Sequence, residues 1–176
     1  MSEEQTISTV RPWRGRLISV RVDQVRLANG RTSSREVVEH PGAVGILAWD
    51  GEHMALVRQW RQPAGEELLE IPAGTLDPGE DAIETARREL GEECQLSAER
   101  WEAGPSFYTA PGFCTERLSL FLATELAPSQ VASPEDENLE LSWVRLPDAL
   151  QAVDAGEIRD AKSVAGILWL ARRLSS

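Results

Sequence analysis

Cysteine, histidine and basic side chains are scarce in this chain of 176 residues, and each shortage excludes a class of function. The two cysteines, Cys94 and Cys114, and the two histidines, His40 and His53, have no zinc-site spacing. Eighteen Lys and Arg stand against 29 Asp and Glu, a formal net charge of −11. Binding to polymeric nucleic acid needs clustered basic side chains. We therefore expect free thiols, no zinc centre and no nucleic-acid partner.

Long apolar segments are also missing. No run reaches the roughly 18 apolar residues that a membrane-spanning helix requires. The first ten residues are polar and acidic and lack the apolar centre of a secretory signal. We expect no membrane association and a cytoplasmic location, where the two cysteines would stay reduced. The length corresponds to one domain with an added arm.

Turn signals divide the chain into short strands and a few helices. Asn29-Gly30 and Asp50-Gly51 are typical of tight hairpins and separate apolar or alternating segments. The expected strands span residues 17–27, 32–40, 43–49, 54–60, 68–71, 101–107, 117–124 and 139–145. The expected helices span 80–94, a short segment from Pro147 to near Gly156, and a last segment capped by Asp160. This mixture predicts an α+β protein with a mixed sheet.

Three glutamates, Glu89, Glu92 and Glu93, lie on one flank of the helix expected over residues 80–94. Like charges at these spacings destabilise a helix by a few tenths of a kcal/mol per pair. A positive group is therefore expected between them. Carboxylate oxygens are the ligands that hard divalent cations prefer, and such cations commonly bind phosphates. The sequence predicts a Mg²⁺ or Mn²⁺ site that serves a small phosphate ester.

Residues 74–96 resemble the Nudix box: Gly, five residues, Glu, seven residues, then Arg-Glu-apolar-x-Glu-Glu-x-Gly-apolar. The matching residues are Gly74, Glu80, Arg88, Glu89, Leu90, Glu92, Glu93 and Leu96. The resemblance implies the Nudix fold, an α/β/α sandwich with a mixed sheet, and Mg²⁺-dependent hydrolysis of a nucleoside diphosphate linked to another group. Gln95 stands where the family has Gly. We expect it to cap the helix in the left-handed conformation at a cost of about 1 kcal/mol.

Other stretches are similar to the ADP-ribose pyrophosphatase branch. They are REVVEHPGAV at 35–44, RQWR at 58–61, LEIPAG at 69–74, YTAPGFCTERLSLF at 108–121 and DAKSVAGILWL at 160–170. The resemblance implies a homodimer that splits ADP-ribose into AMP and ribose 5-phosphate. Residues 1–40 would form an antiparallel β-hairpin arm for dimerisation, and residues 41–176 the catalytic domain. The alternatives are a broader nucleoside-diphosphate-sugar pyrophosphatase and a Nudix domain kept as a non-catalytic nucleotide sensor.

The resemblance also implies roles for individual residues. The expected metal ligands are Glu89 and Glu93, assisted by Glu92, together with the backbone carbonyl of Ala73. Glu92 is also a candidate catalytic residue. The box residues with structural roles are Gly74, Glu80 and Arg88, of which Arg88 would orient a glutamate and Glu80 would hold the junction of loop and helix.

A carboxylate is needed to position or deprotonate the attacking water. In the branch it comes from the loop before the last strand, where Glu135 or Glu137 fits best here. The candidates for substrate binding are Arg35, Arg61, Trp13, Arg16, Gly112 and Phe113. Guanidinium groups suit phosphate geometry, Trp13 or Arg16 would contact adenine, and Gly112 and Phe113 would shape the pocket floor.

Overall fold

The computed structural model describes residues 4–131 and 139–175. Two compact units divide the chain, one of Met1–Gly42 with Tyr108–Arg117 and one of Ala43–Phe107 with Leu118–Ser176. The strands are β1 (Gln5–Arg14), β2 (Ser19–Arg26), β3 (Thr32–Glu39), β4 (Ala43–Ala48), β5 (His53–Arg61), β6 (Glu66–Glu70), β7 (Ala73–Thr75), β8 (Leu96–Tyr108), β9 (Arg117–Pro128) and β10 (Glu140–Arg145). The helices are α1 (Ala82–Cys94), α2 (Leu146–Asp154) and α3 (Ala161–Leu174).

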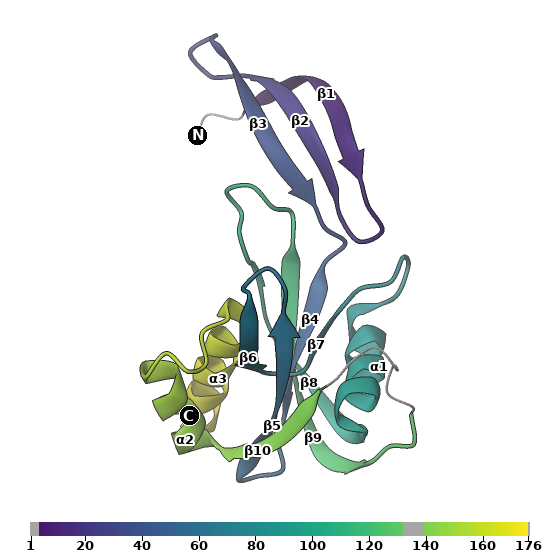
Figure 1. Ribbon diagram of the computed structural model, residues 1–176, viewed down its shortest axis with the longest axis vertical. Helices are drawn as coiled ribbons and strands as arrows, with labels where there is room; N and C mark the ends of the chain where they lie inside the picture. The colour runs from purple at the N-terminus through teal and green to yellow at the C-terminus, as the bar shows by residue number, and fades with distance from the viewer. Residues whose placement is uncertain (1–3, 132–138, 176) are drawn as a thin grey trace. The chain divides into compact units, whose positions relative to one another are not determined.

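The first unit contains a three-stranded antiparallel sheet in the order β1-β2-β3 (Figure 1). The turn from β2 to β3 uses Asn29-Gly30, with Gly30 at φ 79°, a conformation that favours glycine. All ten residues of β1 are exposed. Sequence analysis did not predict β1, because its residues do not follow a regular apolar alternation.

Charged side chains tie the three strands of this sheet together. The carboxylate of Glu39 on β3 accepts hydrogen bonds from Arg11 on β1 and from Ser19 and Arg21 on β2. These bonds, that of Arg11 first, lower the pKa of Glu39 to about 2. In the same unit the loop before β9 lies along β3, where the amide of Val38 donates to the carbonyl of Phe113 (2.7 Å).

The second unit contains two sheets. One has the order β7-β4-β9-β8, with β4 parallel to β9 and antiparallel to β7. The other has the order β10-β5-β6 and is antiparallel throughout. The mixture of parallel and antiparallel pairs, together with three helices, confirms the predicted α+β class with a mixed sheet. Strand β7 was not predicted, because it has only three residues.

Strand β4 is buried along its whole length and separates two hydrophobic cores. Ile46 packs with Leu90 of α1, in a core that Val44, Ala48 and Ala86 also share. Leu47 points to the opposite face of the strand, because successive side chains of a strand alternate. It packs with Ile167 and Leu170 of α3, in a core that includes Ala149 of α2. Figure 1 shows α1 on one side of the β4 strand and α2 and α3 on the other. This arrangement is the predicted α/β/α sandwich.

The close approach of side chains to β4 requires a glycine at position 45. A Cβ atom built on Gly45 would lie 2.9 Å from Cδ2 of Leu120 and 3.0 Å from Cδ1 of Ile71. Two bulky side chains of the core therefore fill the space that a side chain at position 45 would need.

The helix ends follow the sequence signals. Asp160 caps α3 by accepting a hydrogen bond from the amide of Ser163 (3.1 Å). Gln95 ends α1 in the left-handed conformation, at φ 54° and ψ 37°, as predicted for the residue that replaces the box glycine. Within residues 4–131 and 139–175, no helix is long and apolar enough to cross a membrane.

Candidate active site

The guanidinium of Arg88 lies among three glutamates of the second unit. Its Nη1 donates to Oε1 of Glu89 (2.7 Å) and to Oε2 of Glu92 (2.9 Å). Its Nε and Nη2 donate to the two oxygens of Glu80 (3.2 Å each). These bonds, those to Glu80 first, raise the pKa of Arg88. Arg88 therefore supplies the positive charge that the cluster of glutamates requires.

Glu80 joins the loop before α1 to the helix itself. Besides Arg88, its Oε2 accepts from the hydroxyl of Thr85 (2.9 Å) and from the amide of Asp77 (3.4 Å). Its contact with Arg88 is the main cause of its lowered pKa. Because Asp77 belongs to the loop and Thr85 to the first turns of α1, the carboxylate of Glu80 fixes one relative to the other.

Gly74 provides the space in which the carboxyl group of Glu89 lies. A Cβ atom built on Gly74 would be 1.9 Å from both Cδ and Oε1 of Glu89. No side chain of any kind could be accommodated there without moving the glutamate. Glu89 is 9% exposed, which is rare for a carboxylate unless it is paired or binds a cation. The box glycine is thus required by the position of the box glutamate.

Glu93 lies one turn further along α1 and reaches the strand that precedes the box loop. Its Oε2 accepts a hydrogen bond from the backbone amide of Ala73 (2.9 Å). The hydrogen bonds that Arg61 donates to Glu70 are the main cause of the raised pKa of Arg61, and the charge of Glu93 adds to it. Ala73 and Glu93, predicted from two separate parts of the sequence, are therefore in contact in the second unit.

The donor set of this cluster suits a hard divalent cation. It offers carboxylate oxygens and a backbone segment held against one of them, and Mg²⁺ prefers oxygen ligands. Across the described ranges, however, no three His, Cys, Asp or Glu side chains form a ready-made metal cluster. The contacts of Glu89 and Glu92 with Arg88, and of Glu93 with the Ala73 amide, account for this. The residues fit a metal in chemistry, and binding would change their present contacts.

Arg61 ends strand β5 and is held by a residue that sequence analysis missed. Glu70, at the end of β6, accepts from Nε (3.0 Å) and Nη2 (2.6 Å) of Arg61 and is 1% exposed. The sequence did contain a sign that Glu70 is buried and paired, because this glutamate stands inside the apolar run LLEIP. Its other partner, Lys162, lies 92 residues away and could not be inferred from spacing.

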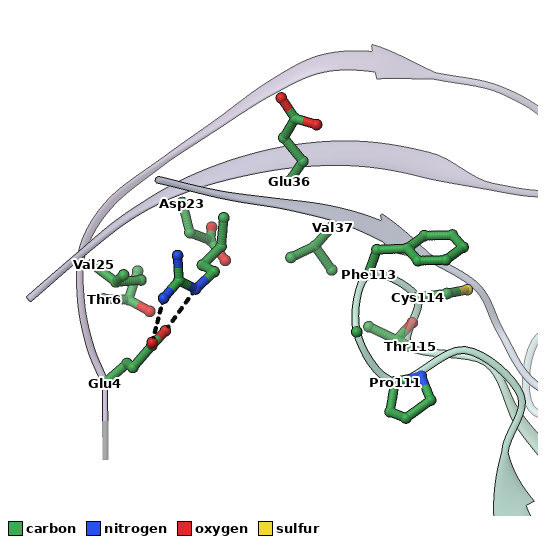
Figure 2. A pocket seen from close by; sticks show the side chains of 12 residues that line it. Glu4, Thr6, Asp23, Val25, Glu36, Val37, Pro111, Phe113, Cys114 and Thr115 are labelled. Carbon is green, nitrogen blue, oxygen red and sulfur yellow. Dashed lines mark hydrogen bonds and ion pairs between the residues drawn. The ribbon is translucent and has the colours of Figure 1, made fainter. Parts of the chain in front are cut away.

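The first unit has a cavity of about 400 Å³ that Arg35, Gly112 and Phe113 all line (Figure 2). Arg35 donates through Nε (3.0 Å) and Nη2 to the carboxylate of Glu4, the contacts drawn as dashed lines at Glu4. Pro111 and Phe113 give the wall an apolar character, and Phe113 is 59% exposed. Three of the six predicted substrate-binding residues therefore share one cavity.

Trp13 and Arg16 belong to the same unit but not to the lining of that cavity. Arg16 lines a second cavity, of about 330 Å³, together with His40 and Glu39. The indole of Trp13 covers Gly15, where an added Cβ would lie 2.3 Å from the ring. Trp13 is 52% exposed.

The predicted catalytic residues Glu135 and Glu137 lie outside the described residues. The chain before them is attached to α1: the amide of Ser129 donates to the carbonyl of Gln95 (2.7 Å). A Cβ atom added to Gly91 of α1 would lie 3.1 Å from Val131, so that side chain packs on the helix. The chain after them begins β10, where Glu140 pairs with Arg58 of β5.

Comparison with known families identifies the class of protein that this fold and site define. The family model described as NUDIX domain matches residues 39–166. The chain therefore belongs to the Nudix family. The matched region contains the box, the whole core between β4 and α1, and the glutamates around Arg88.

Two Bacillus proteins are each 42% identical to this chain over 171 residues, 96% of this chain and 92% of theirs. They are the methanol dehydrogenase activator of Bacillus methanolicus and the ADP-ribose pyrophosphatase of Bacillus subtilis (strain 168). The ADP-ribose pyrophosphatase of Mycobacterium tuberculosis is 39% identical over 93% of this chain and 81% of its own length. The crystal structure of an ADP compounds hydrolase superposes with a TM-score of 0.88, at 22% identity and over 98% of this chain and 95% of that one. The fold is therefore shared with that hydrolase.

We predict that Gly74→Ala displaces the Glu89 carboxylate and lowers metal-dependent activity roughly ten- to a hundredfold, the usual effect of disturbing the support of a metal ligand. The measurement is the rise in unfolding temperature on adding Mg²⁺, together with turnover. Gly104→Ala is the control for crowding as such, because its Cβ would lie 3.0 Å from Trp169 and 3.2 Å from Leu120, neither of which belongs to the glutamate cluster. A Gly74→Ala protein that is stabilised by Mg²⁺ as much as the wild type would contradict this role.

Proposed function

We propose that this protein hydrolyses the diphosphate of ADP-ribose to AMP and ribose 5-phosphate with the help of a divalent cation. The single observation that carries the proposal is the complete set of box glutamates held around Arg88 and Gly74 in a Nudix chain. The substrate is inferred from the relatives, because the Bacillus subtilis ADP-ribose pyrophosphatase matches nearly the whole of this chain.

Glu89, Glu92, Glu93 and the carbonyl of Ala73 would hold the cation, Mg²⁺ or Mn²⁺. A bound cation neutralises phosphate charge and lowers the pKa of water, which favours attack on phosphorus. If Glu89 and Glu92 bound the cation, the two bonds of Arg88 to Glu80 would remain available to hold the guanidinium in place.

The guanidinium of Arg61 would bind the diphosphate of the substrate. Arg61 uses Nε and Nη2 for Glu70, and among the described residues no hydrogen bond uses its Nη1. Arg35, in the first unit, stays a predicted substrate-binding residue, and its ion pair with Glu4 lies on the surface, where such a pair contributes little. Glu135 or Glu137 would position the attacking water and accept its proton.

The first test is a substrate panel of ADP-ribose, ADP-glucose, GDP-mannose and NADH in the presence of Mg²⁺. We expect AMP release to be fastest from ADP-ribose. Glu93→Gln should lose most of the activity, by a factor on the order of 10² or more, because an amide is a poor ligand for a hard cation.

Glu84→Gln is the matched control for that variant. Glu84 lies one turn before Arg88 on the same helix, and its exposed carboxylate pairs with Arg87 (2.8 Å). It should keep near-normal turnover. Equal activity of Glu93→Gln and Glu84→Gln would contradict the catalytic role of the cluster. A preference for another diphosphate would contradict only the choice of ADP-ribose as the substrate.

A second test concerns the carboxylate that handles the water. We expect either Glu135→Gln or Glu137→Gln to reduce kcat by a factor on the order of 10² to 10⁴, the usual contribution of general base catalysis. The affinity for Mg²⁺ should be unchanged, as measured by the metal-dependent rise in unfolding temperature. Near-normal turnover in both single variants would exclude this assignment.

We also propose that the protein is a homodimer joined through the arm of residues 1–40. The support is strand β1, which is exposed throughout and presents Ile7, Val10 and Trp13 to solvent. A strand with an unpaired edge and apolar side chains is a surface that a second chain can cover.

Val10→Glu should therefore shift the protein from dimer to monomer, as measured by light scattering after gel filtration. Val10 is 65% exposed in the single chain. The control is Leu168→Glu, on α3 and 49% exposed, which should leave the mass unchanged. A wild-type protein that is monomeric at micromolar concentration would rule the dimer out.

A further inference from the structure

The chain has a single lysine among its 18 basic residues, and that lysine is in the second unit, at a largely buried position. Lys162 lies in the first turn of α3 with its side chain 13% exposed. Its ammonium group donates to Oε2 of Glu70 and to Oδ1 of Asp160 (2.8 Å). A buried ammonium group is costly unless it is paired, and here two carboxylates pair it.

Glu70 lies between two cations. Arg61 binds both of its oxygens, and Lys162 shares the oxygen Oε2. Burial alone would raise the pKa of Glu70, but the bonds from Arg61 and Lys162 outweigh it and hold the pKa below its usual range. Glu70 is therefore charged at neutral pH and keeps the guanidinium of Arg61 in one orientation.

That orientation leaves the rest of the guanidinium available to a ligand. A guanidinium has five N–H donors, and the two-pronged contact with Glu70 takes two of them. The side chain of Arg61 is 38% exposed. Glu70 is followed along the chain by Ile71, Pro72 and Ala73, and the amide of Ala73 donates to Glu93, so one short segment contacts both Arg61 and a predicted metal ligand.

We propose that Glu70 and Lys162 are positioning residues for the hydrolysis. Lys162 holds the carboxylate of Glu70, and Glu70 holds the guanidinium of Arg61 where it receives the diphosphate of the substrate. This inference rests on the function proposed above and adds two residues to it, neither of which touches the substrate. The advantage is preorganisation, since an arginine already fixed by a buried partner loses less side-chain entropy when it binds.

A merely structural role must be separated from this one. Glu70 and Lys162 also connect β6 with the start of α3, and so does a second ion pair. Glu66 of β6 accepts from Arg159, the residue before the Asp160 cap, with both side chains about half exposed. Glu66 pairs with Arg61 in the β5–β6 ladder, but both side-chain bonds of Arg61 go to Glu70. Glu66→Gln therefore breaks a connection between the same elements and removes a charge next to Arg61 without removing either of these bonds, and it is the matched control.

The first experiment is a double-mutant cycle of Glu70→Gln and Arg61→Ala, with Lys162→Met as a milder companion to Glu70→Gln. We expect Glu70→Gln and Lys162→Met to lower kcat/KM for ADP-ribose roughly ten- to a hundredfold, mostly through KM. In the Arg61→Ala background the same changes should have almost no further effect, because there is no guanidinium left to position. Glu66→Gln should stay within about twofold of the wild type.

A second measurement does not depend on turnover. Isotope-labelled lysine places one set of Cε and Nζ signals in the NMR spectrum, because the chain has one lysine. Inorganic pyrophosphate bound to Arg61 should shift the Lys162 signals in the wild type. The reason is that Arg61 and Lys162 bind the same carboxylate, that of Glu70. The shift should disappear in Arg61→Ala and persist in Glu66→Gln.

The outcomes separate this inference from the proposed function. If the wild type hydrolyses ADP-ribose but the effects of Glu70→Gln and Arg61→Ala simply add, the positioning role is overturned and the function stands. If another diphosphate is the better substrate, the double-mutant cycle is measured with that compound. This outcome contradicts only the choice of ADP-ribose as the substrate. If no diphosphate is hydrolysed and pyrophosphate leaves the Lys162 signals unmoved, both are overturned.

Discussion

The mutual repulsion of glutamates on one flank of α1 is the constraint on which the site depends. Glu89 and Glu92 would destabilise the helix if nothing positive lay between them, and Arg88 supplies that charge. Arg88 is in turn anchored by Glu80, which also binds the loop before the helix. The same four side chains therefore stabilise the helix end, order the loop and keep the carboxylates together.

Much of the fold could be predicted because its signals are local. Gln95 was expected to end α1 with a positive φ, and Asp160 to cap α3, and both were confirmed since each depends on a few neighbouring residues. Strands β1 and β7 were missed because one lacks apolar alternation and the other has only three residues.

The candidate site likewise has residues that the sequence identifies and contacts that it does not. A helical spacing identifies Glu89, Glu92 and Glu93 from the sequence alone. The contact between Gly74 and Glu89 needs the loop to fold back on the helix, and the Arg61–Glu70–Lys162 chain joins β5, β6 and α3. Such contacts depend on how elements pack, and a sequence read residue by residue carries no direct record of them.

Strand β4 has a consequence for folding. Because both of its faces are apolar, moving it by one residue would exchange one buried set of side chains for another and expose nothing to water. Hydrophobicity therefore distinguishes poorly between correct and shifted pairings of this strand. The correct pairing is instead selected by the fit of side chains, since only Gly45 leaves room for Ile71 and Leu120. The register of the central strand is thus set by a glycine, which has no side chain. In a shifted register, a larger residue at this point would clash with Ile71 and Leu120.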